Sequence, residues 1–266
     1  MTRPRPALDK SFAVTRSLCT LLLPHRLKTA QARFELLTRF GAWLVPEYRF
    51  KWPWMDWWHD ASFKRYLEKF GEDRVHNADR RWMLGQLLRL VTDVPGDTVE
   101  CGVYKGSSSW LICRANAGMS GRHHHIFDSF QGISEPDPSD GDHWTRGDLS
   151  CSEETVRKAL EEFRDFTLYP GWIPDRFHEI ANRSFSFVHI DVDLLQPTKD
   201  SLEFFFPRLS PGGILLCDDY GVTTCPGATK ALNDYFQGRS EKPISLSGGG
   251  GYVIKGKVTG HLAALT

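Results

Sequence analysis

The chain has 266 residues, of which 41% are hydrophobic and 25% are charged, the balance of an ordinary soluble globular protein. Lysine plus arginine equals aspartate plus glutamate at 33 each, so no global field attracts nucleic acid or an acidic membrane surface. A function in nucleic-acid binding would therefore need a local basic patch, and we expect neither nucleic acid nor membrane as a partner.

The six cysteines form no CxxC pair, and Cys101 and Cys217 lie within apolar, strand-like runs. This pattern predicts reduced, buried thiols in a cytoplasmic protein, with neither a disulfide framework nor a zinc site. No apolar stretch approaches the length of a membrane-spanning helix. Residues 1–24 begin with basic residues and a short apolar patch but lack the small-residue cleavage signature of a signal peptide.

Residues 1–75 differ in character from the rest because they are basic and rich in aromatic side chains. The densest cluster, YRFKWPWMDWWHD, holds four tryptophans, Trp52, Trp54, Trp57 and Trp58. We predict a helical N-terminal extension over 1–75, followed by the main domain over 76–258 and a short tail over 259–266. The tryptophans fit two roles equally well, a lid over a bound ligand and packing of the extension or of a dimer contact.

From Asn77 onward, apolar residues alternate between the spacing typical of helices and that typical of strands. In chain order, we predict a helix in 77–96, a strand, glycine turn and helix in 98–118, a strand in 123–132, a helix in 152–163, a strand in 185–195, a helix and turn in 198–213, a strand in 214–221, a helix in 227–237 and a closing hairpin element in 248–257. Such alternation predicts βαβ units in a mostly parallel, doubly wound α/β sheet.

Ligands of doubly wound sheets bind outside the carboxyl ends of the strands, and four predicted strands end there in acids or a glycine turn. The first of these ends is VECGVYKGSSS, in which Gly102 and Gly106 permit a tight turn close to a ligand. Its spacing is not the GxGxxG of a dinucleotide fold, and glycine turns after strands are common. Asp128 ends the second strand, where a carboxylate suits a ribose diol; capping of the next turn through Ser129 is the alternative.

The other two strand ends carry paired aspartates. Asp191 and Asp193 would lie on the same side if their strand continued through both, and Asp218 and Asp219 end the next core strand. Clustered carboxylates raise one another's pKa values unless a cation neutralises them, and hard oxygen ligands suit Mg²⁺. The alternatives are local: Asp193 as a helix cap, and Asp219 as an acceptor in the turn that follows it.

Together these motifs resemble the macrocin O-methyltransferase family of class I S-adenosylmethionine-dependent methyltransferases. The resemblance extends over residues 77–240, about two-thirds of the chain. It rests on VECGVYKGSSS, FDSFQGISEP, LYPGWIPDRF, HIDVDLLQPTKDSLEFFFPRLSPGGILLCDDYG and CPGATKALNDYF, in that order. It implies a Rossmann-like fold with a seven-stranded, mostly parallel sheet, and S-adenosyl-L-methionine and Mg²⁺ as cofactors.

The resemblance also implies roles for individual residues. Those implied to bind the cofactor are Glu100, Gly102, Tyr104, Gly106 and Ser108 around its methionine part, Asp128, Ser129 and Phe130 around its adenosine, and Gly171 and Trp172 near its adenine. Asp191 would lie between cofactor and metal, and Asp191, Asp218 and Asp219 would bind Mg²⁺. Leu195, Gln196 and Pro197 depart from the family's usual residues on the acceptor side, so they bear on which acceptor is used.

Methyl transfer to a hydroxyl needs a base within hydrogen-bond reach. Asp191 is the first candidate, and His143 ranks above His189 as the alternative because it lies in a polar loop, 135–150, whose prolines and glycines predict flexibility. That loop is expected to close over the acceptor and exclude water.

The leading interpretation is thus a Mg²⁺-dependent O-methyltransferase that acts on a hydroxyl, of a sugar or a polycycle, in a small natural product. A Rossmann-like hydrolase or phosphotransferase is less favoured because the chain has no GxxxxGK[ST] motif. A non-catalytic cofactor-binding module is less favoured because all three implied metal carboxylates are present. A homodimer is expected only from the family.

Overall fold

The computed structural model describes residues 54–72, 77–119 and 121–260, together with the isolated positions 33, 37, 40 and 41. The chain divides into two compact units, Met1–Tyr66 and Leu67–Thr266. Most of the predicted N-terminal extension, Trp52 included, lies outside the described residues. Its role as a lid or dimer contact stays a prediction.

Residues 54–70, which include the boundary between the two units, form a short helical segment with its own aromatic packing. A 3₁₀ turn, η2 (Asp56–His59), precedes α3 (Ala61–Phe70), whose start is capped by Asp60 through a 2.7 Å hydrogen bond from the Phe63 N–H to its carboxylate. The Trp57 ring packs edge-on against Trp58 and Phe63, with ring centroids 6.0 and 5.9 Å apart.

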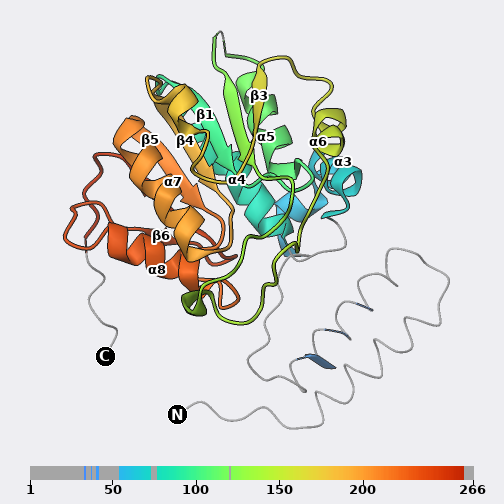
Figure 1. Cartoon of the computed structure of the whole chain (residues 1–266). Coiled ribbons are helices and arrows are strands. Elements are labelled where there is room, and N and C mark those ends of the chain that lie inside the picture. The colour runs from blue at the N-terminus through green and yellow to red at the C-terminus, as the bar shows by residue number, and fades with distance from the viewer. Residues whose placement is uncertain are drawn as a thin grey trace, which may run out of the picture. The chain divides into compact units, whose positions relative to one another are not determined.

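The second unit is built on a seven-stranded sheet in the order β3-β2-β1-β4-β5-β7-β6 (Figure 1). The strands are β1 (Asp97–Cys101), β2 (His124–Asp128), β3 (Phe166–Pro170), β4 (Phe185–Ile190), β5 (Leu209–Cys217), β6 (Ile244–Ser245) and β7 (Gly251–Ile254). The first five strands in this order are parallel; β7 is antiparallel to β5, and β6 to β7. The predicted doubly wound, mostly parallel sheet with a closing hairpin is confirmed.

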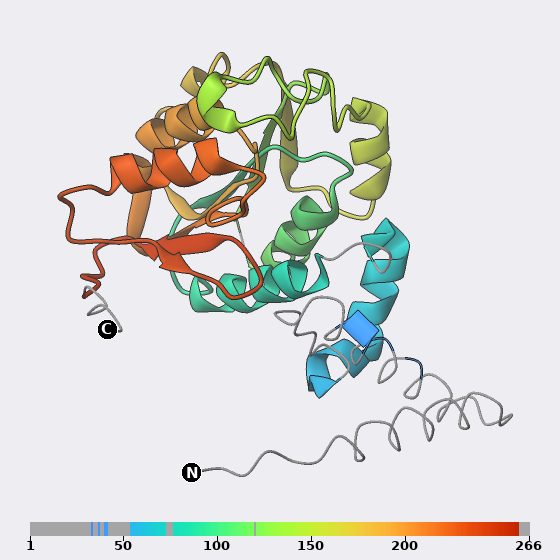
Figure 2. The same cartoon turned by 90° about the horizontal axis from the view of Figure 1, so that it is seen from below.

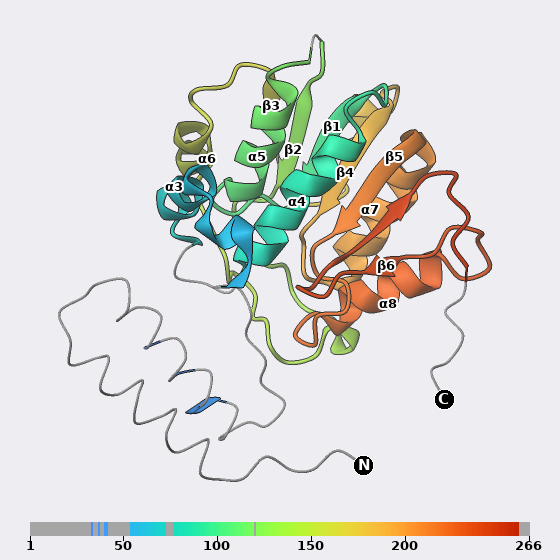
Figure 3. The ribbon, with the colours of Figure 1, turned by 180° about the vertical axis from the view of Figure 1, so that it is seen from behind.

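Helices cover both faces of this sheet (Figures 2 and 3). They are α4 (Ala78–Leu90), α5 (Ser107–Asn116), α6 (Glu153–Ala159), α7 (Leu195–Arg208) and α8 (Pro226–Tyr235), with short 3₁₀ turns at η4 (Pro138–Asp140) and η5 (Phe177–Ile180). Residues of α4 and α5 pack against Phe187 and Leu216 on one face, and residues of α7 and α8 pack against Phe185 and Val188 on the other. Among the described residues, no helix is both long and apolar enough to cross a bilayer.

The end of β4 decides two points that the sequence left open. The strand β4 ends at Ile190, and Asp193 adopts a left-handed φ of 61°, so alternation does not carry Asp191 and Asp193 to the same side. The helix α7 then begins at Leu195, with Leu194 as an N-cap that makes no side-chain hydrogen bond. Asp193 therefore does not cap α7, and its carboxylate is free to serve the strand ends.

The turn after β1 brings two strand ends into close contact. Gly102 has a φ of +83°, and its N–H donates to the Phe127 carbonyl of β2 at 2.9 Å. A Cβ at this position would overlap the Asp191 carbonyl oxygen after β4. Only glycine therefore allows the turn after β1 to touch the end of β4.

We expect Gly102→Ala to lower the free energy of unfolding by about 2 kcal/mol or more, because the substitution combines a left-handed φ with an overlap against backbone. Gly85→Ala is the matched control: it lies within α4 with open space around its Cβ, and should raise stability by about 0.5–1 kcal/mol. Urea denaturation of both variants measures the difference. Equal stability of Gly102→Ala and wild type would contradict the close contact.

Candidate active site

A large cavity, of about 830 Å³, opens where the parallel strands end. Its size is that of a site for a cofactor together with a small acceptor. Ten of the residues predicted from the sequence line it: Gly102, Tyr104, Ser108, Asp128, Ser129, His143, Trp172, Asp191, Asp218 and Asp219. Four others, Glu100, Gly106, Phe130 and Gly171, are not among the lining residues.

Glu100 is fully buried beneath the cavity, between the sheet and α5. Its carboxylate accepts a hydrogen bond from Ser109 and one of 2.7 Å from Nδ1 of His189, and it lies 3.9 Å from Nε2 of His124. Burial alone would raise the pKa of Glu100, but its contacts with His124 and His189 outweigh burial and hold the pKa well below the usual range. The structure thus places Glu100 in a buried ion-pair network rather than in the cavity wall.

Asp128 ties the end of β2 to the glycine turn after β1. Its Oδ2 accepts hydrogen bonds from the N–H groups of Val103 at 2.8 Å and Tyr104 at 3.4 Å, and its Oδ1 accepts one of 2.7 Å from the Phe130 N–H. The carboxylate still lines the cavity, and Oδ1, which accepts only one hydrogen bond, keeps a further lone pair for a ligand. Tyr104 has a φ of 46° and is half exposed, so the turn presents its ring at the cavity.

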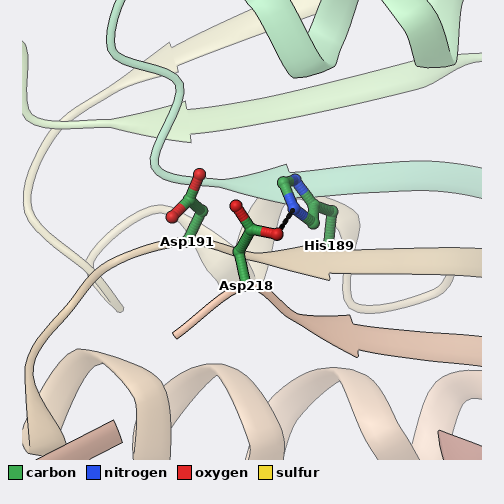
Figure 4. A group of neighbouring side chains, drawn as sticks. All are labelled: His189, Asp191 and Asp218. Carbon is green, nitrogen blue, oxygen red and sulfur yellow. Dashed lines mark ion pairs between the residues drawn. The ribbon is translucent and has the colours of Figure 1, made fainter. Parts of the chain in front are cut away.

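The acidic strand ends divide into two sets of side chains whose ligand atoms lie within 4.8 Å of one another. The first is His189, Asp191 and Asp218, shown in Figure 4, where Nε2 of His189 is 3.8 Å from Oδ1 of Asp218. The second is Asp193, Asp219 and Cys225. The predicted trio of Asp191, Asp218 and Asp219 is therefore split, with Asp219 in a different set from the other two.

Two arginines from the first turn of α4 supply positive charge to the first set. Nη2 of Arg80 is 2.6 Å from Oδ2 of Asp218 and 3.7 Å from Oδ1 of Asp219, and it also donates to the Asp218 carbonyl at 2.6 Å. Nη1 of Arg81 is 3.1 Å from Oδ2 of Asp218, and its Nη2 is 3.8 Å from Asp191. Burial alone would raise the pKa of Asp218, but these arginines outweigh burial and lower it well below its usual range.

The remaining carboxylates are compensated less closely, since Arg81 is 3.8 Å from Asp191 and Arg80 is 3.7 Å from Asp219. Burial and the charge of Asp191 raise the pKa of Asp193 to about 7, and burial with Asp193 and Asp191 raises that of Asp219 well above its usual range. Burial and Asp218 likewise raise the pKa of Asp191. Asp219 accepts a 2.9 Å hydrogen bond from the N–H of Asp193, which is not the turn contact considered as its alternative. Three adjacent carboxylates with raised pKa values provide the oxygen donors and the excess negative charge that suit a hard divalent cation.

The loop that carries His143 and Trp144 forms part of the cavity wall. Nε1 of Trp144 donates to Sγ of Cys225 at 3.4 Å, and the Cys225 thiol in turn donates to Oδ1 of Asp193 at 3.4 Å. This wall is therefore linked by hydrogen bonds to the second acidic set, although its composition predicts a flexible loop.

Sequence reasoning missed Arg80 and Arg81, which read only as part of an amphipathic helix. A signal was present, because two adjacent cations in the first turn oppose the helix dipole, which favours acids there. Arginines at such an unfavourable place indicate carboxylates brought near by the fold.

The fold and cavity define a class I methyltransferase architecture, and the solved structure of the O-methyltransferase NovP superposes with a TM-score of 0.56 at 27% identity, over 68% of this chain and 81% of that one. The Macrocin-O-methyltransferase (TylF) family matches residues 71–245, and the chain belongs to this family.

Two relatives have named activities. The "8-demethyl-8-(2,3-dimethoxy-alpha-L-rhamnosyl)-tetracenomycin-C 4'-O-methyltransferase" of Streptomyces olivaceus is 35% identical over 55% of this chain and 60% of its own length. The "Demethyldecarbamoylnovobiocin O-methyltransferase" of Streptomyces niveus is 34% identical over 66% of this chain and 74% of its own length. The match to the first relative thus leaves two-fifths of that protein uncovered.

His189 gives the buried network a measurable pH dependence. Burial alone would lower its pKa, but Asp218 and Glu100 outweigh burial and raise the pKa from 6.5 to about 10. A raised pKa favours the folded state fully below pH 6.5, and this contribution is lost as the pH rises towards 10. We expect the free energy of unfolding of the wild type, measured in EDTA, to fall between pH 6.5 and 10 more steeply than that of His189→Gln.

The exposed His178 provides the control. His178→Gln should keep the wild-type slope over the same pH range. Parallel slopes for wild type and His189→Gln would show that His189 is not held protonated by the two carboxylates.

Proposed function

We propose that this protein is an S-adenosyl-L-methionine-dependent O-methyltransferase that methylates a sugar hydroxyl of a small glycosylated natural product, with Mg²⁺ bound at the acidic strand ends. The observation that carries the proposal is the cavity, which joins a glycine turn, a ribose-suited carboxylate and an acidic edge in a chain of this family. The sugar hydroxyl is favoured over a polycyclic one because the rhamnosyl-tetracenomycin relative carries a sugar in its name.

The cofactor half of the cavity lies at the ends of β1 and β2. Oδ1 of Asp128 has one lone pair left to accept from a ribose hydroxyl, and the turn from Gly102 to Ser108 has no side chain at its closest approach to the end of β4. Trp172 follows β3 and offers a flat face for the adenine. Glu100, Gly106, Phe130 and Gly171 would then act on the cofactor through the residues next to them.

The acidic half would hold the metal through Asp191 and Asp218 of the first set and Asp219 of the second, with Asp193 beside them. A bound Mg²⁺ would lower the pKa of an acceptor hydroxyl and fix its direction. Arg80 and Arg81 keep Asp218 ionised by direct pairing, so that this carboxylate stays a charged ligand.

Proton removal from the acceptor falls to this chain's own side chains. Burial and Asp218 raise the pKa of Asp191, which favours it as a general base, but a carboxylate that also binds the metal is a weaker base. His143, in the loop that forms part of the cavity wall, is the alternative base. Trp144 and Leu149 in the same wall supply apolar surface that excludes water from the reacting groups.

The competing functions differ in simple tests. A metal-dependent hydrolase or phosphotransferase would not bind S-adenosyl-L-methionine, and a non-catalytic module would bind it without transfer. A panel of hydroxylated glycosides, assayed with labelled methyl donor, identifies the acceptor class. A homodimer and a cytoplasmic location stay predictions.

We expect Asp128→Ala to weaken S-adenosyl-L-methionine binding by about 10- to 100-fold, because a buried hydrogen bond to a charged group contributes about 1.5–3 kcal/mol. Isothermal titration calorimetry measures the dissociation constant. Asp175→Ala is the control: it removes an exposed carboxylate outside the cavity, and the variant should bind S-adenosyl-L-methionine as the wild type does. If Asp128→Ala bound the cofactor as tightly as the wild type does, Asp128 would have no role in holding the ribose. If the wild type did not bind S-adenosyl-L-methionine, the proposed activity would be overturned.

We expect Asp219→Asn to weaken Mg²⁺ binding by at least about tenfold while leaving cofactor affinity within twofold, since it removes a proposed metal ligand that follows β5, whereas Asp128 ends β2. Calorimetric Mg²⁺ titration and methyl-transfer rates measure the two effects, and combining it with Asp218→Asn should abolish metal-dependent transfer. Asp234→Asn, an exposed carboxylate on α8, is the control. A wild-type rate that is unchanged in EDTA would remove the metal from the reaction.

A further inference from the structure

Asp140 is a buried carboxylate in the middle of the loop that forms the acceptor-side wall. It is 2% exposed, although the loop residues on either side of it in the sequence are exposed. Asp140 ends the short turn η4, which lies beside the start of α8 (Figures 1 and 2). A carboxylate so deeply buried in a polar loop needs hydrogen-bond partners that compensate for its lost hydration.

Its partners are two backbone N–H groups from different segments. Oδ1 accepts a 2.6 Å hydrogen bond from the N–H of Leu195, the first residue of α7, and Oδ2 accepts one of 2.8 Å from the N–H of Asp137 in its own loop. Asp137 reciprocates by accepting from the Ser139 N–H at 2.9 Å, which closes the turn. The Asp140 side chain therefore anchors the loop to α7.

The start of α7 compensates the charge of Asp140. Within the part of the chain that the structure describes, no lysine, arginine or histidine forms an ion pair with this carboxylate. The 14-residue α7 presents its N-terminus to the carboxylate, and Leu195 would otherwise have an unsatisfied N–H because Leu194 makes no side-chain cap. Asp140 therefore caps α7 from a loop 55 positions earlier in the sequence.

Gly227 keeps the space for this contact open. It lies in the first turn of α8, and a Cβ there would overlap Oδ1 of Asp140 and lie 2.8 Å from the Leu195 nitrogen. Three segments, the loop, α7 and α8, therefore meet at one carboxylate.

These segments also form the wall of the cavity. His143 and Trp144 follow Asp140 in the loop, and Gln196 and Pro197 follow Leu195 in α7; all four line the cavity. We propose that Asp140 is a positioning residue for the acceptor: it joins these two parts of the wall, so that the acceptor side is pre-formed. This inference rests on the proposed function only in naming the ligand of that wall as the acceptor.

A pre-formed wall has a consequence for kinetics, because acceptor binding then costs little ordering of the loop. We expect Asp140→Ala to raise the KM for the acceptor by about tenfold, the value of a hydrogen bond to a charged group. The dissociation constant for S-adenosyl-L-methionine should stay within twofold, since Asp128 and the turn at Gly102 are not touched. Asp140→Asn keeps a side-chain oxygen that accepts the hydrogen bond from the Leu195 N–H but loses the hydrogen bond from the Asp137 N–H, so its effect should be intermediate.

Limited proteolysis tests the anchor without any acceptor. Arg146 is exposed in the same loop, so trypsin cleavage after Arg146, followed by mass spectrometry, reports how often the loop opens. We expect cleavage to be fastest in Asp140→Ala, intermediate in Asp140→Asn and slow in the wild type. Asp142→Ala is the control, because it removes an exposed carboxylate that does not line the cavity, two residues further on.

Gly227→Ala acts on the same contact from α8 and should also speed cleavage after Arg146. Combined with Asp140→Ala, it should add less than the product of the two single effects, because both disrupt one contact. Should Asp140→Ala fail to fold, Asp140→Asn and Gly227→Ala carry the same comparison.

Cleavage of Asp140→Ala and Gly227→Ala no faster than that of Asp142→Ala would overturn the anchor. Faster cleavage with an unchanged acceptor KM would overturn its role in positioning. Failure of the wild type to bind S-adenosyl-L-methionine would overturn the proposed function instead, and the proteolysis result would stand apart from it.

Discussion

The pairing of Arg80 and Arg81 with Asp218 is the interaction on which the site depends. A parallel sheet brings the carboxyl ends of its strands to one edge, and this chain places five aspartates there, at three strand ends. Buried carboxylates without a counter-charge cost several kcal/mol each or take up protons. Because α4 packs its apolar face against Phe187 and Leu216, its first turn reaches the end of β5 and delivers both guanidinium groups to one of these aspartates. The packing of α4 on the sheet therefore supplies the positive charge that stabilises the acidic edge.

The positive charge is shared unequally among these aspartates, so their pKa values differ. Asp218 is held ionised by two arginines and by His189, while Asp191, Asp193 and Asp219 share burial and mutual repulsion that raise their pKa values. One end of the acidic edge is therefore a fixed anion, and the other has affinity for a proton or a cation. Such a gradient lets neighbouring carboxylates take different roles, as ligand and as base, on one sheet edge. Beneath it, Glu100 and His124 continue the polar network into the sheet, which fixes the orientation of His189.

The sequence predicts the parts of this arrangement that follow from local pattern, and fails where tertiary contacts decide. Alternating helices and strands predict the sheet, and strand ends with acids predict the edge on which Asp128, Asp191 and Asp218 meet. Strand alternation does not extend to Asp191 and Asp193, because β4 ends at Ile190, yet both residues line the cavity. Glu100 sits one residue inside β1, so its side chain turns beneath the sheet edge and not into the cavity. Arg80 and Asp140 bind partners 138 and 55 positions away, a separation that no local pattern encodes.

The contact between Asp140 and α7 also suggests how one scaffold could serve different acceptors. Asp140 binds the backbone N–H of Leu195, so the anchor does not depend on which side chain stands at that position. Gln196 and Pro197, which follow Leu195, both line the cavity. A backbone anchor fixes the turn while leaving its side chains free to change, whereas the proposed metal and cofactor residues would act through their side chains. Under the proposed function, variation in this first turn of α7 would therefore reshape the acceptor wall without disturbing the acidic edge, which would place selectivity and chemistry on separate elements of the same cavity.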